Sequence, residues 1–154
     1  MTTINKKKLV YIAAPLFNEI EWNRNTEIKT FVESLGFEVH LPQDKAGRFS
    51  DLSKKSDNIK LLRESVFNND LKGVKTCDII LCLLDGRVPD EGTCVELGMA
   101  YVLGKICVGY KTDIRAMGKD GFDNIMITES IKDNMAGTLD ELKTILLKFK
   151  EDKK

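Results

Sequence analysis

Two patterns of hydrophobic and polar residues follow one another along the 154-residue chain: short apolar runs, and longer stretches in which apolar residues recur at helical spacing. Four short apolar runs have the length and composition of buried strands: 8–14, 37–41, 78–85 and 105–110. Longer stretches with apolar residues at helical spacing predict helices: 19–35, 57–71, 92–103 and an amphipathic 139–149. Strands that are apolar on both faces and alternate with helices are typical of a parallel sheet covered on both sides. The pattern therefore predicts an α/β fold, a doubly wound, flavodoxin-like sandwich with a roughly five-stranded parallel sheet.

Two further segments have weaker patterns. The segment Gln43–Asp57 is polar, contains Gly47 and has no period, which predicts a loop long enough to have a functional role. The stretch 111–124 is polar and irregular, and residues 124–127 are predicted to form a last short strand. Since no repeat or linker interrupts the chain, we expect residues 1–154 to form one domain.

The predicted topology indicates where a site would form. Ligands of such folds bind at the carboxyl ends of the strands. Four segments are expected to meet there: 13–17, 42–48, 85–93 and the stretch after Tyr110.

Composition narrows the class of protein. Lys and Arg together number 24, as do Asp and Glu, and the basic runs lie at the termini, so we expect no nucleic-acid partner. The first apolar run, 9–17, has nine residues and a proline, too short for a membrane span and unlike a signal peptide. The four cysteines show no Cys-x-x-Cys spacing. These features favour a cytoplasmic protein with reduced thiols and no membrane partner.

Glu96 stands in unusual surroundings for a carboxylate, because its neighbours three and four positions away are all small or apolar. Glutamate is almost never fully buried unless it is paired. Either Glu96 lies at the rim of a packed helix and pairs with a lysine, or it faces a crevice from the second turn of a helix that begins near Glu91. In that crevice the positive end of the helix favours the ionised form, and Gly92 and Thr93 leave space for a ligand.

Two aspartates are further candidates. Asp90 directly precedes the predicted helix and is expected to be its N-cap, or to bind a sugar hydroxyl, or both through different oxygens. Asp70 lies at the end of the predicted helix 57–71 and borders its apolar face. A carboxylate near a helix C-terminus is disfavoured, so its pKa is expected to be raised. Asp70 is then either a turn-forming residue or an acid that protonates a leaving base.

Other kinds of catalytic site find no support in the sequence. His40 is the only histidine, and a lone histidine in a strand is usually packed or exposed rather than catalytic. With one histidine and scattered cysteines we expect no zinc site. No Gly-x-Gly-x-x-Gly, P-loop or Gly-x-Ser-x-Gly motif follows a strand, which argues against dinucleotide binding, P-loop NTPases and serine hydrolases.

Four blocks resemble the motifs of the nucleoside 2-deoxyribosyltransferases: YIAAPLF (11–17), NNDL (68–71), PDEGTCVELGMAY (89–101) and NIM (124–126). The resemblance runs from about residue 8 to residue 147. It implies an enzyme that exchanges the base of 2'-deoxynucleosides with free nucleobases and needs neither metal nor cofactor. Glu96 falls on the nucleophile that forms a covalent 2-deoxyribosyl ester, Tyr11 on the tyrosine that positions it, and Asp70 on the proton donor to the leaving base.

The resemblance also implies substrate-binding roles. Asp90 falls on the aspartate that holds sugar hydroxyls, and Phe17 on an aromatic that packs against the base. Asn124 and Met126 fall on residues that family members lend to a neighbouring subunit, which implies a homo-oligomer, either a dimer or a hexamer. Some members carry a base-reading glutamine a few residues past the proline of the second strand. Gln43 directly follows Pro42 here, which leaves its equivalence and the range of bases open.

Two alternatives remain at this stage. The family includes relatives that hydrolyse deoxynucleoside monophosphates, and a hydrolase with the same nucleophile would need cations for the 5'-phosphate. Arg87 and Arg115 are the candidates. The other alternative is a non-catalytic nucleotide-sensing module on the same scaffold, because fold does not fix function.

Overall fold

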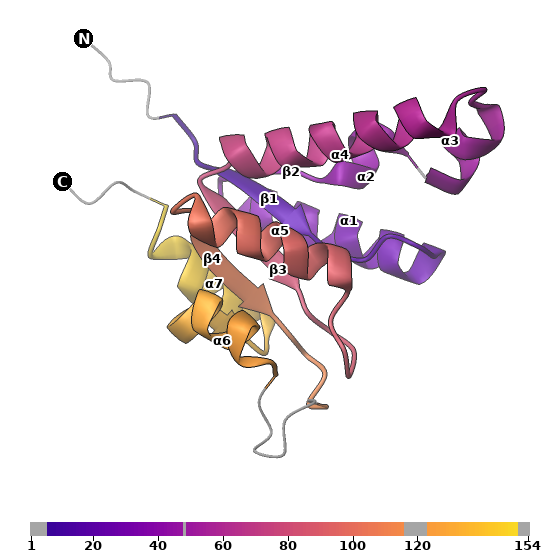
Figure 1. Ribbon diagram of the computed structural model, residues 1–154. Coiled ribbons are helices and arrows are strands. Elements are labelled where there is room, and N and C mark those ends of the chain that lie inside the picture. The colour runs from indigo at the N-terminus through magenta and orange to yellow at the C-terminus, as the bar shows by residue number, and fades with distance from the viewer. Residues whose placement is uncertain (1–5, 48, 116–122, 151–154) are drawn as a thin grey trace, which may run out of the picture.

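The computed structural model describes residues 6–47, 49–115 and 123–150, and its centre is one parallel sheet (Figure 1). The strand order is β2-β1-β3-β4-β5, and every neighbouring pair is parallel. The strands are β1 (Leu9–Ala13), β2 (Glu38–His40), β3 (Ile79–Leu83), β4 (Ile106–Tyr110) and β5 (Met135–Ala136). This arrangement confirms the predicted doubly wound, flavodoxin-like sheet.

Helices cover both faces of the sheet, and side chains of alternating strand residues pack against them. α1 (Glu19–Ser34) and α7 (Leu139–Leu147) share one apolar core with Val10 and Ile12 of β1. α4 (Ile59–Thr76), α5 (Glu91–Val102) and α6 (Ile125–Ile131) share the other core with Tyr11 and Ala13. Figure 1 shows α4, α5 and α6 together on one side of the sheet. Tyr11 therefore points to the side on which α5 presents Glu96.

Local signals in the sequence explain the ends of the best-predicted helices. The side chain of Asn18 caps α1 by accepting a hydrogen bond from the Glu21 N–H, and Gly36 ends the turn after it with a φ of 94°. α5 begins at Glu91, as predicted, with Asp90 as its N-cap. α7 ends at Leu147, two residues before the predicted end.

The prediction of a loop over Gln43–Asp57 is wrong. Two short helices, α2 (Pro42–Ala46) and α3 (Phe49–Lys55), occupy most of this segment. Pro42 stands in the first turn of α2, where its missing N–H costs nothing, and Gly47 ends that helix with a φ of 67°. Helices this short contain too few apolar positions for a period to be visible.

The helix predicted over 57–71 continues to Thr76. Its predicted stripe is only partly buried: Ile59 and Phe67 are 45% and 53% exposed, and the buried residues of α4 are Gly73 and Val74. The first half of α4 packs against α2 and α3 rather than on the sheet. Asp70 consequently lies inside the helix, and the expectation that it stands at a helix C-terminus is wrong.

The strand predicted over residues 124–127 is also wrong. The side chain of Asn124 accepts a hydrogen bond from the Met126 N–H at 2.9 Å and so begins α6, which buries Ile127 and Ile131, four positions apart. A short 3₁₀ turn, η1 (Lys132–Asn134), leads into β5. Two residues of strand are too few to give a recognisable alternation.

The composition predicted reduced thiols and no membrane-spanning segment. All four cysteines are free; Cys77, Cys82 and Cys107 are buried and Cys94 is half-buried. Among the described residues, no helix combines the length and apolar character that a membrane crossing requires.

Candidate active site

The centre of the candidate site is a hydrogen bond between a completely buried tyrosine and a half-buried glutamate. The Tyr11 hydroxyl, at the end of a ring that is completely buried on β1, donates to Oε1 of Glu96 at 2.6 Å. A donor this close to a carboxylate oxygen forms a short, charge-assisted bond. Within the described residues, no hydrogen bond reaches the second oxygen, Oε2.

Glu96 lies in the second turn of α5 and is half-buried, neither sealed in the core nor free in bulk water. The pKa of Glu96 is raised from 4.5 to about 7. Burial is the main cause, the Tyr11 hydrogen bond opposes it, and the negative charges of Asp70 and Asp90 add to it. No lysine or arginine in the described part of the chain forms an ion pair with Glu96. Of the two arrangements that the sequence left open, the lysine-paired carboxylate is therefore the one that the structure contradicts.

Asp70 is a second carboxyl group with altered acidity. It lines a small cavity of about 70 Å³ together with Leu16, Gln43 and Val66. Burial raises the pKa of Asp70 from 3.8 to about 6. The predicted direction of the shift is confirmed, but its cause is desolvation within α4 rather than the end of a helix dipole. Asp70 can therefore hold a proton near neutral pH.

Asp90 is the N-cap of α5, as predicted. Its Oδ2 accepts hydrogen bonds from the Thr93 N–H at 2.8 Å and from the Thr93 hydroxyl at 3.1 Å. Its other oxygen accepts no hydrogen bond from the residues that the structure describes. Gly92 is exposed, and a Cβ there would approach Oδ2 of Asp90 to 3.1 Å. The oxygen beside this position without a side chain is thus the one that caps the helix.

Gln43 has a structural task that the sequence did not indicate. Its side chain is 5% exposed and joins α2 to α1: Nε2 donates to the Trp22 carbonyl at 3.0 Å and to the Thr26 hydroxyl at 3.2 Å. Its Oε1 accepts from Asn25, whose amide also donates to the carbonyl of Pro15. This network fixes the loop after β1 against α1 and α2. The base-reading role of Gln43 stays a prediction.

Three other predicted residues lie on the surface. Phe17, in the loop after β1, is 79% exposed. Asn124 caps α6 and Met126 lies in its first turn. Both line a groove of about 1270 Å³ that α5 and α6 form, and Met126 is 75% exposed. The structure therefore does not bring these two residues together with Tyr11 and Asp70 within one chain.

Comparison with known proteins identifies the family. The family model described as nucleoside 2-deoxyribosyltransferase matches residues 10–142. The chain belongs to this family. A nucleoside deoxyribosyltransferase of Limosilactobacillus fermentum is 32% identical over 104 residues, which are 62% of this chain. The match spans only 60% of the length of that relative.

Solved structures extend the comparison over more of the chain. A 2-deoxyribosyltransferase from Bacillus psychrosaccharolyticus is 25% identical with a TM-score of 0.69, covering 88% of this chain and 90% of that one. A CMP N-glycosidase from Clostridium botulinum shares the fold, with 19% identity, a TM-score of 0.57 and coverage of 90% and 98%. The transferase family and an N-glycosidase are thus built on the same scaffold.

The two arginines considered as phosphate ligands differ in their surroundings. Arg115 is paired with Asp113, whose Oδ1 accepts from Arg115 Nε at 2.9 Å. Both line a cavity of about 390 Å³ with Arg24 and Asp85, whose ion pair ties α1 to the end of β3. Arg87 is exposed in the loop before α5. Only Arg87 is on a segment adjoining Asp90.

The sequence did not indicate that His40 and Gly73 lie next to Tyr11. The His40 ring stacks on the Tyr11 ring, and Gly73 of α4 lies against both. Tyr11 and His40 are partners in the β1–β2 register, so their side chains point to the same face. Once two adjacent parallel strands are predicted, that register is the one signal that would have brought His40 to attention.

The described residues contain no cluster of three or more His, Cys, Asp or Glu side chains able to hold a metal ion. The groups that gather around Tyr11 are carboxyl groups with raised pKa values and no cationic partner in the described region. Such a set can supply a nucleophile and an acid for displacement at a sugar carbon.

Proposed function

We propose that the chain is a nucleoside 2-deoxyribosyltransferase that exchanges the nucleobase of 2'-deoxynucleosides through a covalent ester on Glu96. The observation that carries this proposal is the 2.6 Å hydrogen bond from Tyr11 to one oxygen of a half-buried carboxylate. The hydrogen bond fixes the direction of the group and leaves Oε2 for the attack. Membership of the family supports the same reaction.

The proposed reaction has two displacements. Oε2 of Glu96 attacks C1' as the bond from C1' to the base nitrogen breaks, and the electron pair of that bond goes to the base. Asp70 gives its proton to the base, which leaves as the neutral molecule. A nitrogen of a second base then attacks C1', the ester bond breaks, and Asp70 takes up the proton that the new base releases. Two inversions give overall retention and ping-pong kinetics.

Binding roles complete the proposal. The free oxygen of Asp90 accepts a hydrogen bond from a sugar hydroxyl, and the exposed Gly92 places no side chain next to Asp90. The base lies toward Asp70 and Phe17, with Gln43 at the edge of the same cavity. The chemistry needs no cofactor, because the nucleophile and the acid are both side chains of this chain.

We further propose that the protein is a homo-oligomer whose subunits complete one another's sites through Asn124 and Met126. The support is the apolar groove between α5 and α6, where Val102, Met126 and Ile125 are 84%, 75% and 69% exposed. Monomeric proteins rarely expose apolar side chains in one continuous patch of this kind. The proposal covers a dimer and a hexamer equally.

A base-exchange assay tests the transfer. The protein is incubated with deoxyinosine in the presence and in the absence of adenine. Adenine-dependent formation of deoxyadenosine is expected, and intact mass spectrometry is expected to detect one added deoxyribosyl group that is absent from Glu96→Ala. Glu64→Ala, an exposed glutamate on α4, is the matched control and should form the adduct.

The fold shared with a CMP N-glycosidase gives a second candidate, hydrolysis of a deoxynucleoside or its 5'-monophosphate. In that reaction water instead of a base attacks the ester. Release of deoxyribose or its phosphate with no base exchange would select the hydrolase. Exchangeable ligand binding with no adduct in the wild-type protein would select a nucleotide-sensing module.

A further inference from the structure

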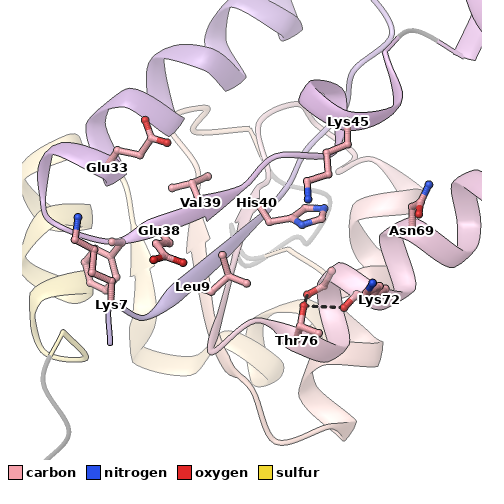
Figure 2. Close-up of a pocket in the computed structure, with 12 residues that line it drawn as sticks. Lys7, Leu9, Glu33, Glu38, Val39, His40, Lys45, Asn69, Lys72 and Thr76 are labelled. Carbon is pink, nitrogen blue, oxygen red and sulfur yellow. Dashed lines mark hydrogen bonds between the residues drawn. The ribbon is translucent and has the colours of Figure 1, made fainter. Parts of the chain in front are cut away.

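A second cavity lies behind the Tyr11 ring, on the edge of the sheet. It has a volume of about 690 Å³ and lies between β2 and α4, with His40, Lys45, Lys72 and Glu38 among its lining residues. Figure 2 shows His40 extending from β2 toward α4, with Lys45 beside it. His40 thus has one side open to this cavity and the other against Tyr11.

The contact between His40 and Tyr11 is a ring stack. The ring centroids are 5.1 Å apart and the ring planes meet at 26°. An offset stack of this kind stabilises one orientation of both rings. Gly73 closes the arrangement from α4, because a Cβ on it would come within 2.6 Å of Tyr11 Cε2 and 3.0 Å of His40 Nε2. The Tyr11 ring is therefore held between β2 and α4, and its hydroxyl extends beyond them to Glu96.

We propose that His40 is a positioning residue: through its stack it fixes the Tyr11 ring so that the hydroxyl stays on Oε1 of Glu96. The inference rests on the proposed role of Glu96 as nucleophile. A tyrosine ring that rocks on its Cβ moves its hydroxyl farther than any other atom, so the distant end of the ring needs the firmest support. A displacement of about 1 Å in a catalytic group can cost a hundredfold in rate.

The support comes from the ring itself and not from a proton on it. Burial and the neighbouring charge of Lys45 lower the pKa of His40, so the imidazole is neutral at neutral pH. Its other charged neighbours are Asp44 on α2, whose charge raises that pKa, and Lys72 across the cavity on α4. Within the described residues no hydrogen bond joins His40 to Tyr11 or to Glu96. A flat neutral ring at position 40 should therefore be sufficient.

Two substitutions at position 40 test this proposal in single-turnover measurements of adduct formation. His40→Ala removes the ring and is expected to slow the reaction about tenfold at saturating substrate with little change in substrate affinity, because His40 does not line the Asp70 cavity. It should also move the alkaline limb of the pH profile upward, since a loosened Tyr11 lowers the pKa of Glu96 less and Glu96 has the higher pKa of the two reacting carboxyl groups. His40→Phe keeps a flat ring, for which the adjoining cavity has room, and should react within about threefold of wild type.

Glu38→Ala is the matched control, because Glu38 lies two positions earlier on the same strand and lines the same cavity without contacting Tyr11. Its rate and pH profile should equal those of the wild type. Thermal unfolding of each variant separates loss of fold from loss of alignment. Wild-type kinetics in a folded His40→Ala, or a folded His40→Phe as slow as His40→Ala, would overturn the positioning role. If the wild-type protein itself forms no adduct, the proposed function fails first.

Discussion

The hydroxyl of Tyr11 and the carboxylate of Glu96 meet at 2.6 Å although the two residues are 85 positions apart in the sequence. The sheet brings them together, because Tyr11 is on β1 and α5 packs on the face to which its side chain points. The bond favours the ionised form of a carboxyl group that burial pushes toward the neutral form. The reactivity of Glu96 depends on the balance between these two effects.

Replacing Tyr11 by phenylalanine tests that balance. Without the hydroxyl, the pKa of Glu96 should rise further above 7, since the hydrogen bond is what lowers it. Glu96 has the higher pKa of the two reacting carboxyl groups, about 7 against about 6 for Asp70, so the alkaline limb of the bell-shaped rate profile should move to higher pH. Loss of a hydrogen bond to a charged group costs about 1.5–3 kcal/mol, so adduct formation should slow by roughly 10- to 100-fold. The measurement is the burst of released base as a function of pH, and an unmoved limb would contradict it.

Asp70→Asn tests the acid. The proposed reaction needs Glu96 ionised and Asp70 protonated, and their pKa values of about 7 and about 6 predict a rate maximum between those pH values. Asparagine cannot deliver a proton, so the variant should be slower and should lose the decline on the alkaline side. Its rate should instead rise to a plateau with the ionisation of Glu96 alone, whose pKa falls when the negative charge of Asp70 is removed.

The control for this series is Asp57→Asn, an exposed aspartate just before α4. It should keep both limbs. A bell-shaped profile that survives in Asp70→Asn would assign the alkaline limb to another group and remove Asp70 from the mechanism.

Glu96→Gln should stabilise the fold at high pH at the expense of activity. The pKa of Glu96 is higher in the folded protein, about 7, than its ordinary value of 4.5. Ionising the group therefore costs stability, progressively as the pH rises between these values and fully above them. Glutamine avoids this cost and can still accept the Tyr11 hydrogen bond through its carbonyl oxygen.

The expected gain at about pH 8 is on the order of 2 kcal/mol in the free energy of unfolding, less than the full shift because Glu96 is half-buried. At about pH 4 the gain should disappear. Urea denaturation at the two pH values measures it, with Glu64→Gln as the exposed control. Equal stability of wild type and Glu96→Gln at both pH values would mean that ionising Glu96 does not destabilise the folded protein.

The elements that position Glu96 were predictable because each has a continuous pattern of apolar residues. The residues between Asp78 and Asp85 are all apolar. α5 combines an aspartate cap with apolar residues on most sides, so a single glutamate among them stood out. Tyr11 came from the family resemblance alone, whereas Asp70 was a candidate acid from its place in the predicted helix as well. The physical cause of the Asp70 shift was not predictable, because it depends on where α4 ends and on the helices that cover it.

The features that could not be predicted from the sequence are short helices and contacts between residues far apart in the chain. α2 and α3 have five and seven residues, too few to show a helical period, yet they form the wall of the cavity beside Asp70. The sequence left open whether Gln43 reads a base, and it gave no sign of the three hydrogen bonds to α1 in which its side-chain amide takes part. Such partners lie about twenty positions away and become visible only when the chain is folded.

Gly73→Ala should damage the protein although it improves helix propensity. Alanine in the interior of α4 would normally stabilise it by about 1 kcal/mol relative to glycine. Here the new Cβ would lie 2.6 and 2.7 Å from two carbons of the Tyr11 ring, which is completely buried and cannot move aside. Either α4 lifts away, taking Asp70 with it, or the ring tilts and its hydroxyl leaves Glu96.

We therefore expect a lower melting temperature and adduct formation slowed by at least about tenfold, consistent with the cost of overpacking a core. Lys75→Ala, at an exposed position two residues later on α4, is the control and should leave both nearly unchanged. A Gly73→Ala variant that is more stable than the wild type would show that the close approach of α4 to Tyr11 is not maintained in solution.

Val102→Glu tests the proposed assembly. Val102 is 84% exposed at the end of α5, in the groove that also contains Met126, and it contacts none of the proposed reacting groups. A carboxylate placed there loses its hydration when a second subunit covers the groove, so assembly should weaken strongly while the subunit keeps its fold. Analytical ultracentrifugation should show a shift toward monomer, with activity that falls in parallel and recovers at high protein concentration. If the variant dissociates and remains fully active at every concentration, Asn124 and Met126 of a neighbouring copy contribute nothing to the site.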